Sequence, residues 1–323
     1  MSFSRNVKKE LAKHIPSARH CQIAEIGAII SLCGKIIQEE PQQYGIKITT
    51  ENLTVARKYF MLVKETFHGE VFFSEKEAPA GKKNNLYVLD VKDKELTKKI
   101  LEATKLLASD GKLLQNDAVV NPFIIQNTCC KRAFLRGVFL VSGSISDPEK
   151  TYHFEIIMPT VERAEQIQNV IRSFGVDAKI VMRKRYHVVY VKDGSQIVDI
   201  LNVMEAHKAL MDLENVRILK EMRNSINRQV NCEAANINKT VAAATKQLED
   251  ILYIKETVGF GDLSTGLEEI ARLRIEQPDA SLKELGSMLS KPIGKSGVNH
   301  RLRKLSEIAD SLREQKEEKE HGN

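Results

Sequence analysis

The stretch AFLRGVFLVSGSIS, residues 133–146, is almost wholly apolar, yet it contains Gly137 and Gly143 six positions apart. A glycine inside a helix costs roughly 0.8–1 kcal/mol relative to alanine. Gly137 therefore needs a compensating role, and close packing against the backbone of a second helix is the usual one. The chain contains a candidate for that second helix.

The candidate is an earlier copy of the same segment. CQIAEIGAIISLCG (21–34) aligns with CKRAFLRGVFLVSG (130–143) at a shift of 109 residues, and the small residues coincide. Two further matches follow in the same order at shrinking shifts, 54–69 with 160–175 and 87–93 with 187–193. The last decrease reflects a longer loop, SEKEAPAGKKNN (74–85), in the first copy than around RKRY (183–186) in the second. Three matches in one order indicate a duplicated unit.

Both copies predict the same elements. A small-residue helix ends at Gly34 or Gly143 and is followed by a hairpin. An amphipathic helix comes next, with Thr54 or Thr160 as its N-cap, and a second hairpin and helix complete the unit. The sequence therefore predicts an α+β fold in which two αββαββα repeats form one domain with pseudo-twofold symmetry.

The two glycine-bearing helices are apolar on nearly every side, so each is expected to be buried on nearly every side. Small residues at four-residue spacing, Ala24 with Ala28 and Ala133 with Gly137, would let the two backbones approach along one seam. The alternative is two unrelated core helices that happen to carry Gly.

This arrangement resembles the LAGLIDADG homing endonuclease fold, in which two such helices pair between two four-stranded saddles that sit astride DNA. IGAIISLCG (26–34) and LRGVFLVSG (135–143) occupy the nine-letter signature. In that family the eighth position is an aspartate that holds the catalytic metal, whereas here it is Cys33 and Ser142. Magnesium requires hard oxygen ligands. The resemblance therefore implies a retained scaffold without its catalytic acids, and no catalytic residue is expected.

Composition favours a cytoplasmic protein with two or three domains. The 323 residues are 42% hydrophobic, the N-terminus lacks a signal-peptide core, and no window approaches the ~20 apolar residues of a membrane span. The net charge of +6 is only a modest indication of an anionic partner. Five cysteines form no CxxC pair and are near no histidine cluster in the sequence, which predicts reduced, mostly buried thiols and no metal or other cofactor: Cys21, Cys33, Cys129, Cys130 and Cys232.

Residues 206–244 read as a polar, helical linker that includes the asparagine-rich NSINRQVNCEAANINKT (224–240). Asparagine is a poor helix former. Either these asparagine side chains cap helix ends and contact solvent, or some of them face DNA together with Arg223 and Arg228.

The last third predicts a helix-turn-helix at 245–315, before a charged tail at 316–323. Ser281 and Glu284 form a capping box, SKPIGKSG breaks the helix, and the next helix has an apolar stripe at 298, 302, 305, 309 and 312. Arg reads guanine edges, Asn reads adenine and Lys meets phosphate. The predicted DNA-binding residues are Lys291, Lys295, Ser296, Asn299, His300, Arg301, Arg303 and Lys304. The alternative is a basic, solvated helix in a generic helical domain.

A basic hairpin in the second repeat is a secondary candidate for DNA contact. The segment MRKRYH (182–187) places Arg183, Lys184 and Arg185 in the turn between two predicted strands. Such a turn could lie on phosphates, but a basic hairpin tip is also ordinary surface.

Across essentially the whole chain, the sequence is similar to the WhiA family of bacterial transcriptional regulators. The most specific pieces are the two degenerate repeat helices, NRQVNCEAANINKT (227–240) and KPIGKSGVNHRLRKL (291–305). The resemblance implies an N-terminal helix (1–20), a LAGLIDADG-like domain (21–205, with repeats at 21–109 and 129–204) and a helix-turn-helix similar to the fourth conserved region of sigma factors.

The implied function is non-enzymatic, sequence-specific binding to double-stranded promoter or chromosomal DNA on the nucleoid. In that family the role is sporulation control, or cell division and chromosome segregation, and other regulators or RNA polymerase are possible further partners. Two alternatives stay open. One is a residual metal-dependent endonuclease, which the missing acids oppose, and the other is an adaptor that binds protein through the LAGLIDADG-like domain. The oligomeric state is also left open.

Overall fold

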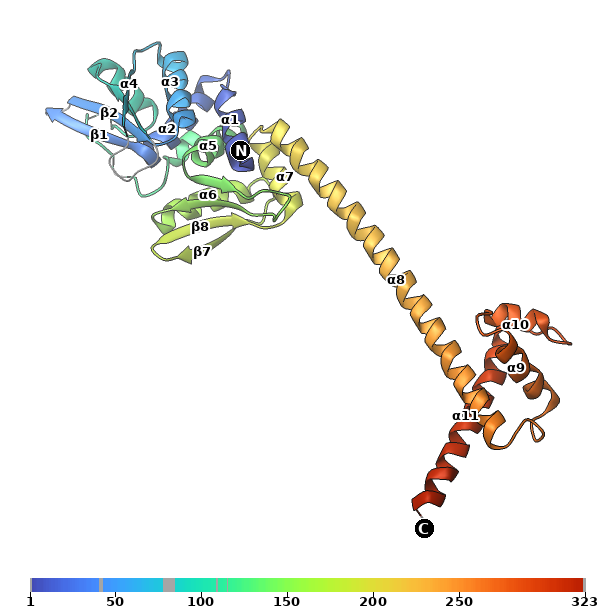
Figure 1. Ribbon diagram of the computed structural model, residues 1–323. Coiled ribbons are helices and arrows are strands. Elements are labelled where there is room, and N and C mark those ends of the chain that lie inside the picture. Colours follow the sequence, from blue (N-terminus) through green and yellow to red (C-terminus); the bar gives the residue numbers. More distant parts are fainter. Residues whose placement is uncertain (1, 41–42, 78–84, 109, 115, 322–323) are drawn as a thin grey trace. The chain divides into compact units, whose positions relative to one another are not determined.

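The computed structural model describes residues 2–40, 43–77, 85–108, 110–114 and 116–321 (Figure 1). Contacts divide the chain into two compact units, Met1–Glu221 and Met222–Asn323. The division falls inside one long helix, α8 (His207–Thr257), within the segment that the sequence suggested as a linker.

The first unit contains α1 (Phe3–Lys13) and two copies of one succession of elements. The first copy comprises α2 (Arg19–Cys33), β1 (Gly34–Glu40), β2 (Gln43–Thr50), α3 (Leu53–Phe67), β3 (Phe72–Lys76), β4 (Leu86–Val91) and α4 (Lys94–Ala103). A 3-10 helix, η1 (Pro122–Ile125), precedes the second copy, which comprises α5 (Thr128–Ser142), β5 (Gly143–Ile145), β6 (Phe154–Met158), α6 (Val161–Arg172), β7 (Lys179–Arg183), β8 (Tyr186–Val191) and α7 (Gly194–Val203). The predicted duplicated αββαββα fold is confirmed. The predicted longer loop at 74–85 is too long by three residues, because residues 74–76 pair with β4 as the end of β3, and its residues 78–84 lie outside the described residues.

Each copy forms a four-stranded antiparallel sheet, blue in the first copy and green to yellow in the second (Figure 1). The strand orders are β1-β2-β4-β3 and β5-β6-β8-β7, which is the same topology twice. Alternate residues of the second strand in each sheet are buried, Ile46 and Ile48 in β2 and Ile156 and Met158 in β6. Since side chains alternate across a strand, one face of each sheet packs on the helices.

The helix boundaries follow local chemistry, with one correction. Thr160 caps α6 as predicted and accepts a hydrogen bond from the backbone N–H of Arg163 at 3.5 Å. The prediction that Thr54 caps α3 is wrong, because Asn52 occupies the N-cap and its side chain accepts from the Thr54 N–H at 2.9 Å. Asparagine is a stronger N-cap residue than threonine, so the helix begins two residues earlier than predicted.

Helices α2 and α5 pack against each other along the predicted small residues. A Cβ added to Gly137 would lie 2.9 Å from the carbonyl oxygen of Glu25 and 3.0 Å from the Cβ of Ala28. Ala24, Ala28 and Ala133 are fully buried. The absence of a side chain at 137 therefore permits close approach of the two backbones, and the alternative of two unrelated core helices is wrong.

Charged side chains are also buried beside this seam, and no sequence pattern had indicated them. The Lys58 ammonium lies 2.9 Å from a carboxylate oxygen of Glu25, and neither side chain is exposed. Lys58 also donates to the backbone oxygens of Leu11 and His14, and the Arg136 Nε lies 3.8 Å from Glu25. Burial raises the pKa of Glu25 and lowers the pKa of Lys58, while each partner's charge opposes that shift in the other. Removing either Glu25 or Lys58 would therefore leave the other as an uncompensated buried charge, which strongly destabilises a fold.

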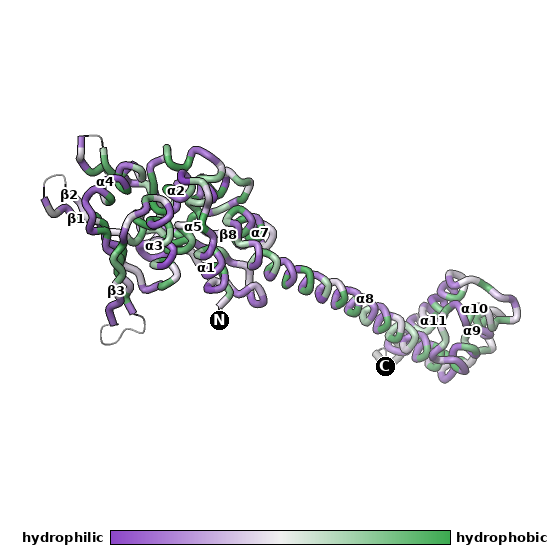
Figure 2. The backbone as a smooth tube through the Cα atoms, turned by 90° about the horizontal axis from the view of Figure 1, so that it is seen from above, coloured by the Kyte–Doolittle hydropathy of each residue, from purple (hydrophilic) through white to green (hydrophobic). Residues whose placement is uncertain are grey.

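The second unit is all helical in its described part. After α8 come α9 (Thr265–Glu276), α10 (Leu282–Met288) and α11 (Lys295–His321). Hydrophilic and hydrophobic residues alternate along the tube of α8 (Figure 2). Among the described residues, none of the helices combines the length and the apolar character of a membrane span.

Candidate nucleic-acid interface

A short helix and a tight turn position α11. Ser281 and Glu284 form the predicted capping box at the start of α10: the Glu284 N–H donates to the Ser281 hydroxyl and the Ser281 N–H donates to the Glu284 carboxylate. A Cβ added to Gly286 would lie 2.3 Å from the carbonyl oxygen of Ile293. The N–H of Ile293 also donates to the carbonyl of Gly286 at 3.1 Å. A glycine in α10 therefore lets the turn before α11 fold back closely.

The apolar stripe predicted for α11 is the side that packs on the rest of the unit. Val298, Leu302, Leu305 and Ala309 are buried, and Leu312 is half-buried at the edge of the same core. This spacing of three and four residues places them on one face of a helix. Burial of this stripe fixes the orientation of α11 and determines which of its side chains face solvent.

The outward side of α11 and the turn before it are basic and polar. Arg303 is 79% exposed and makes one ion pair, 3.2 Å from Glu307 on the same helix. An exposed pair of this kind contributes little, so Arg303 can turn to another partner at small cost. We call the exposed predicted residues of this surface the α11 face: Lys291, Lys295, Ser296, Asn299, His300, Arg303 and Lys304.

One predicted member does not belong to this face. Arg301 is half-buried, and its guanidinium donates to the carbonyl oxygen of Gly266 at 3.2 Å. A Cβ at Gly266 would lie 3.2 Å from that guanidinium. The expectation that Arg301 points outward is wrong, because the start of α9 lies against it. The hydrogen bond from Arg301 therefore joins α11 to the start of α9.

A hollow of about 800 Å³ extends along one end of the α11 face. It is lined by residues of α8 between 239 and 248, by residues 278–283 and by Lys295 and Asn299 of α11. Lys239 and Lys283 add two cations that the sequence analysis missed, because they are far from α11 along the chain. Asp279 also lines the hollow, so its charge is mixed.

The secondary candidates are exposed but differ in their surroundings. Arg183 lies 3.2 Å from the Glu155 carboxylate, and the guanidinium of Arg185 lies 5.4 Å from the ring centre of Tyr186. Only Lys184 and Arg185 of the three predicted turn residues form the turn between β7 and β8, where both are exposed, because Arg183 is the last residue of β7. An acidic neighbour therefore offsets part of the charge of this turn. On α8, both remaining candidates are exposed, Arg223 and Arg228.

Neutral side chains occupy the two positions that correspond to the catalytic acids, and each donates a hydrogen bond to a backbone carbonyl of its own helix. The Cys33 thiol donates to the carbonyl oxygen of Ile29 at 3.2 Å, and the Ser142 hydroxyl donates to that of Val138 at 3.1 Å. Burial raises the pKa of Cys33 to about 12. Neither side chain offers the charged oxygen that a magnesium site requires, so these residues do not fit the metal of the homing endonucleases.

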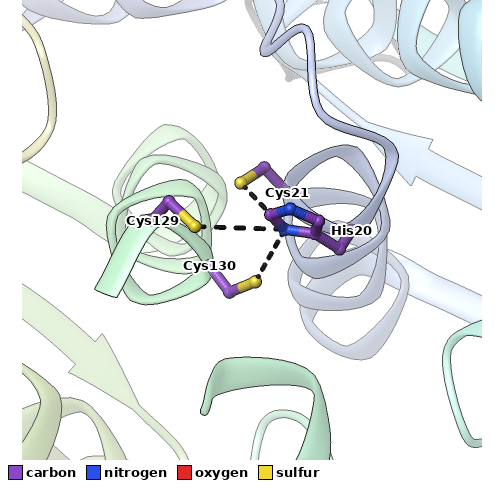
Figure 3. Close-up of side chains that lie close together, drawn as sticks. All are labelled: His20, Cys21, Cys129 and Cys130. Atoms are coloured by element: carbon purple, nitrogen blue, oxygen red, sulfur yellow. Dashed lines mark hydrogen bonds between the residues drawn. The ribbon is translucent and has the colours of Figure 1, made fainter. Parts of the chain in front are cut away.

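The structure contradicts two expectations about the cysteines. Cys129 and Cys232 are exposed and Cys33 is half-buried, so the thiols are not mostly buried. Three of the cysteines also lie close to a histidine, which the sequence analysis did not predict. Tertiary packing brings four ligand atoms within 4.8 Å of one another, those of His20, Cys21, Cys129 and Cys130 (Figure 3). The repeat alignment was the available signal, because it superimposes residues 20 and 21 on residues 129 and 130.

Three family descriptions match consecutive parts of the chain. A WhiA N-terminal LAGLIDADG-like domain matches residues 19–107, and a WhiA LAGLIDADG-like domain matches residues 131–223. A WhiA C-terminal HTH domain matches residues 226–309. Together they span both repeats and the helix-turn-helix.

Whole-chain relatives agree with these matches. The probable cell division protein WhiA of Lachnoclostridium phytofermentans is 60% identical over 97% of this chain and 100% of its own. The probable cell division protein WhiA of Alkaliphilus oremlandii is 50% identical over 98% of this chain and 99% of its own. The crystal structure of full-length DUF199/WhiA from Thermatoga maritima shares the fold, with a TM-score of 0.58 and 22% identity over 96% of this chain and 99% of that one. The duplicated LAGLIDADG-like domain, the helix-turn-helix and these relatives together show that the chain belongs to the WhiA family.

Proposed function

We propose that the chain is a non-enzymatic, sequence-specific regulator of transcription that binds double-stranded DNA, with α11 as the reading helix. The α11 face carries this proposal. Its cations and its asparagine amide project from a helix whose opposite side is locked into a core. Arg and Asn side chains on such a helix can read base edges in the major groove while Lys side chains contact phosphates.

The names of the relatives favour a role in cell division. We propose that the regulated sites are promoters or other chromosomal sequences, and that regulation serves cell division and chromosome segregation or sporulation control. Binding to chromosomal DNA would associate the chain with the nucleoid. Chromosomal mapping of the full-length protein would identify the sites and supply DNA fragments for the following measurements.

Two substitutions on α11 are expected to weaken DNA binding in different ways. If Arg303 is bidentate to a guanine, Arg303→Ala should cost about 1–3 kcal/mol and relax the preference at one base pair. Lys295→Ala should instead weaken binding to all sequences alike and reduce the salt slope by about one, because one phosphate contact is lost. Titration of mapped and scrambled fragments at several salt concentrations separates the two effects.

Lys316→Ala is the matched control, since Lys316 is exposed on the same helix but lies beyond the α11 face. Circular dichroism should show that all three variants fold. If Arg303→Ala and Lys295→Ala bind as the parent does while Arg183→Ala and Arg185→Ala abolish binding, the first unit is the reader. The roles proposed here would then be reversed.

The protein is expected not to cut the DNA that it binds. Cys33 and Ser142 are neutral and donate to their own helices, so they cannot replace the two carboxylates of a hydrolytic metal site. Mapped DNA incubated with the full-length protein and Mg²⁺ or Mn²⁺ should stay intact on denaturing gels. Nicking that Cys33→Ala abolishes would restore the endonuclease interpretation.

A further inference from the structure

A cluster of soft metal ligands lies at the N-terminal ends of the paired helices. His20 and Cys21 are the second and third residues of α2, and Cys129 and Cys130 are the second and third residues of α5. Figure 3 shows the three thiols on the same side of the His20 imidazole, each turned toward it. The helices end at Cys33 and Ser142, so this cluster lies at the opposite end of the pair from the degenerate catalytic positions.

The duplicated fold explains why the four side chains meet. The residues at 20 and 21 occupy the same positions in the first repeat as those at 129 and 130 do in the second. Close packing along the Gly137 seam brings the two helix starts together. The pseudo-twofold axis therefore turns two adjacent pairs in the sequence into one group of four.

The separations suit a tetrahedral ion. The Nδ1 atom of His20 lies 3.1 Å from the sulfur of Cys130, 3.3 Å from that of Cys21 and 4.0 Å from that of Cys129. Four ligands at zinc–sulfur and zinc–nitrogen bond lengths would lie roughly 3.5–3.8 Å from one another. All four ligand atoms lie within 4.8 Å of one another, so side-chain adjustments of up to about 1 Å would place them around one centre at zinc bond lengths.

The donor set selects the class of ion. Three thiols and one imidazole form the Cys₃His set of structural zinc sites, whereas magnesium and calcium prefer oxygen ligands. Cys21 and Cys130 are buried while His20 and Cys129 are exposed, so an ion could enter from solvent.

We propose that His20, Cys21, Cys129 and Cys130 bind one zinc(II) ion, which fastens the starts of α2 and α5 to each other. A structural site of this kind has all four positions taken by protein ligands and needs no open coordination position. Its role is to join the two repeats at the end of the seam opposite Cys33 and Ser142.

The first test uses the full-length chain purified under reducing conditions without chelators. Elemental analysis should find one zinc per chain. After removal of zinc, Co²⁺ titration should give the intense visible bands of tetrahedral cobalt and a near-ultraviolet thiolate charge-transfer band, and added Zn²⁺ should abolish both. Failure of the reduced chain to bind either ion, or an octahedral cobalt spectrum, would refute the proposal.

The second test assigns the ligands. Cys129→Ser alters an exposed ligand, so the fold should tolerate it, and Cys232→Ser is the matched control at an exposed thiol on α8. Loss of a direct ligand should weaken zinc binding more than the 10–100-fold typical of outer-shell changes. Zinc competition against a chromophoric chelator should show this loss in Cys129→Ser and His20→Ala, but not in Cys232→Ser.

Equal zinc affinity in Cys129→Ser and the parent would exclude this site. A disulfide among Cys21, Cys129 and Cys130 that persists in mass spectra of the reduced chain, with no zinc bound, would show that the cluster has a different chemistry. Neither result depends on DNA binding, so the zinc proposal and the proposed function can fail separately.

Discussion

Lys58→Met is expected to lower the free energy of unfolding of the first unit by about 3–5 kcal/mol, the usual cost of breaking a buried ion pair by removing one partner. Among the described residues, the substitution leaves the fully buried Glu25 carboxylate with the guanidinium of Arg136, 3.8 Å away, as its remaining ion-pair partner. It also removes the donor to the carbonyl oxygens of Leu11 and His14. Each buried acceptor that loses its partner adds a desolvation cost.

The double variant Lys58→Met/Glu25→Leu is the control that separates the charge from the volume. Replacing both members of a buried pair by apolar residues is often neutral or stabilising, so the double variant should recover most of the loss. The chain contains no tryptophan, and unfolding in urea is therefore followed by circular dichroism. Hydrogen exchange of peptides from α2 and α3 assigns the change to the first unit. A single variant as stable as the parent would mean that the ion pair contributes nothing.

Gly137→Leu should destabilise the first unit by about 1–3 kcal/mol, the usual cost of overpacking a well-packed core. A Cβ at this position already lies 2.9 Å from the backbone oxygen of Glu25 and 3.0 Å from Ala28. Backbone atoms of a helix cannot move aside as the end of a flexible side chain can. The remaining leucine atoms must then separate α2 from α5.

Gly137→Ala gives a sharper comparison, because this change in an ordinary helix would stabilise it by roughly 0.8–1 kcal/mol. We expect a loss instead, and we expect Ala28→Gly in the same chain to restore only part of it, since the contact with the Glu25 oxygen remains. The melting temperature and the urea midpoint measure both effects. A gain in stability for Gly137→Ala would contradict close packing at the seam.

Local patterns in the sequence determined most of the architecture. The two repeats, the glycines that end α2 and α5, the capping box at Ser281 and the apolar stripe of α11 were all predicted. Each of these depends on residues within a few turns of one another or on the match between copies. The error at Thr54 has the same origin, because Asn52 is an alternative cap only two residues away.

Only the tertiary structure decided which distant side chains meet. Arg301 and Arg303 lie two residues apart, but the start of α9 covers one and leaves the other exposed. The Lys58–Glu25 pair and the His20 cluster likewise join residues from different helices. Periodicity tells which face of a helix is buried, but not which residues of another helix lie against it. Contacts between helices depend on the packing of whole elements, and here the close approach at Gly137 sets that packing.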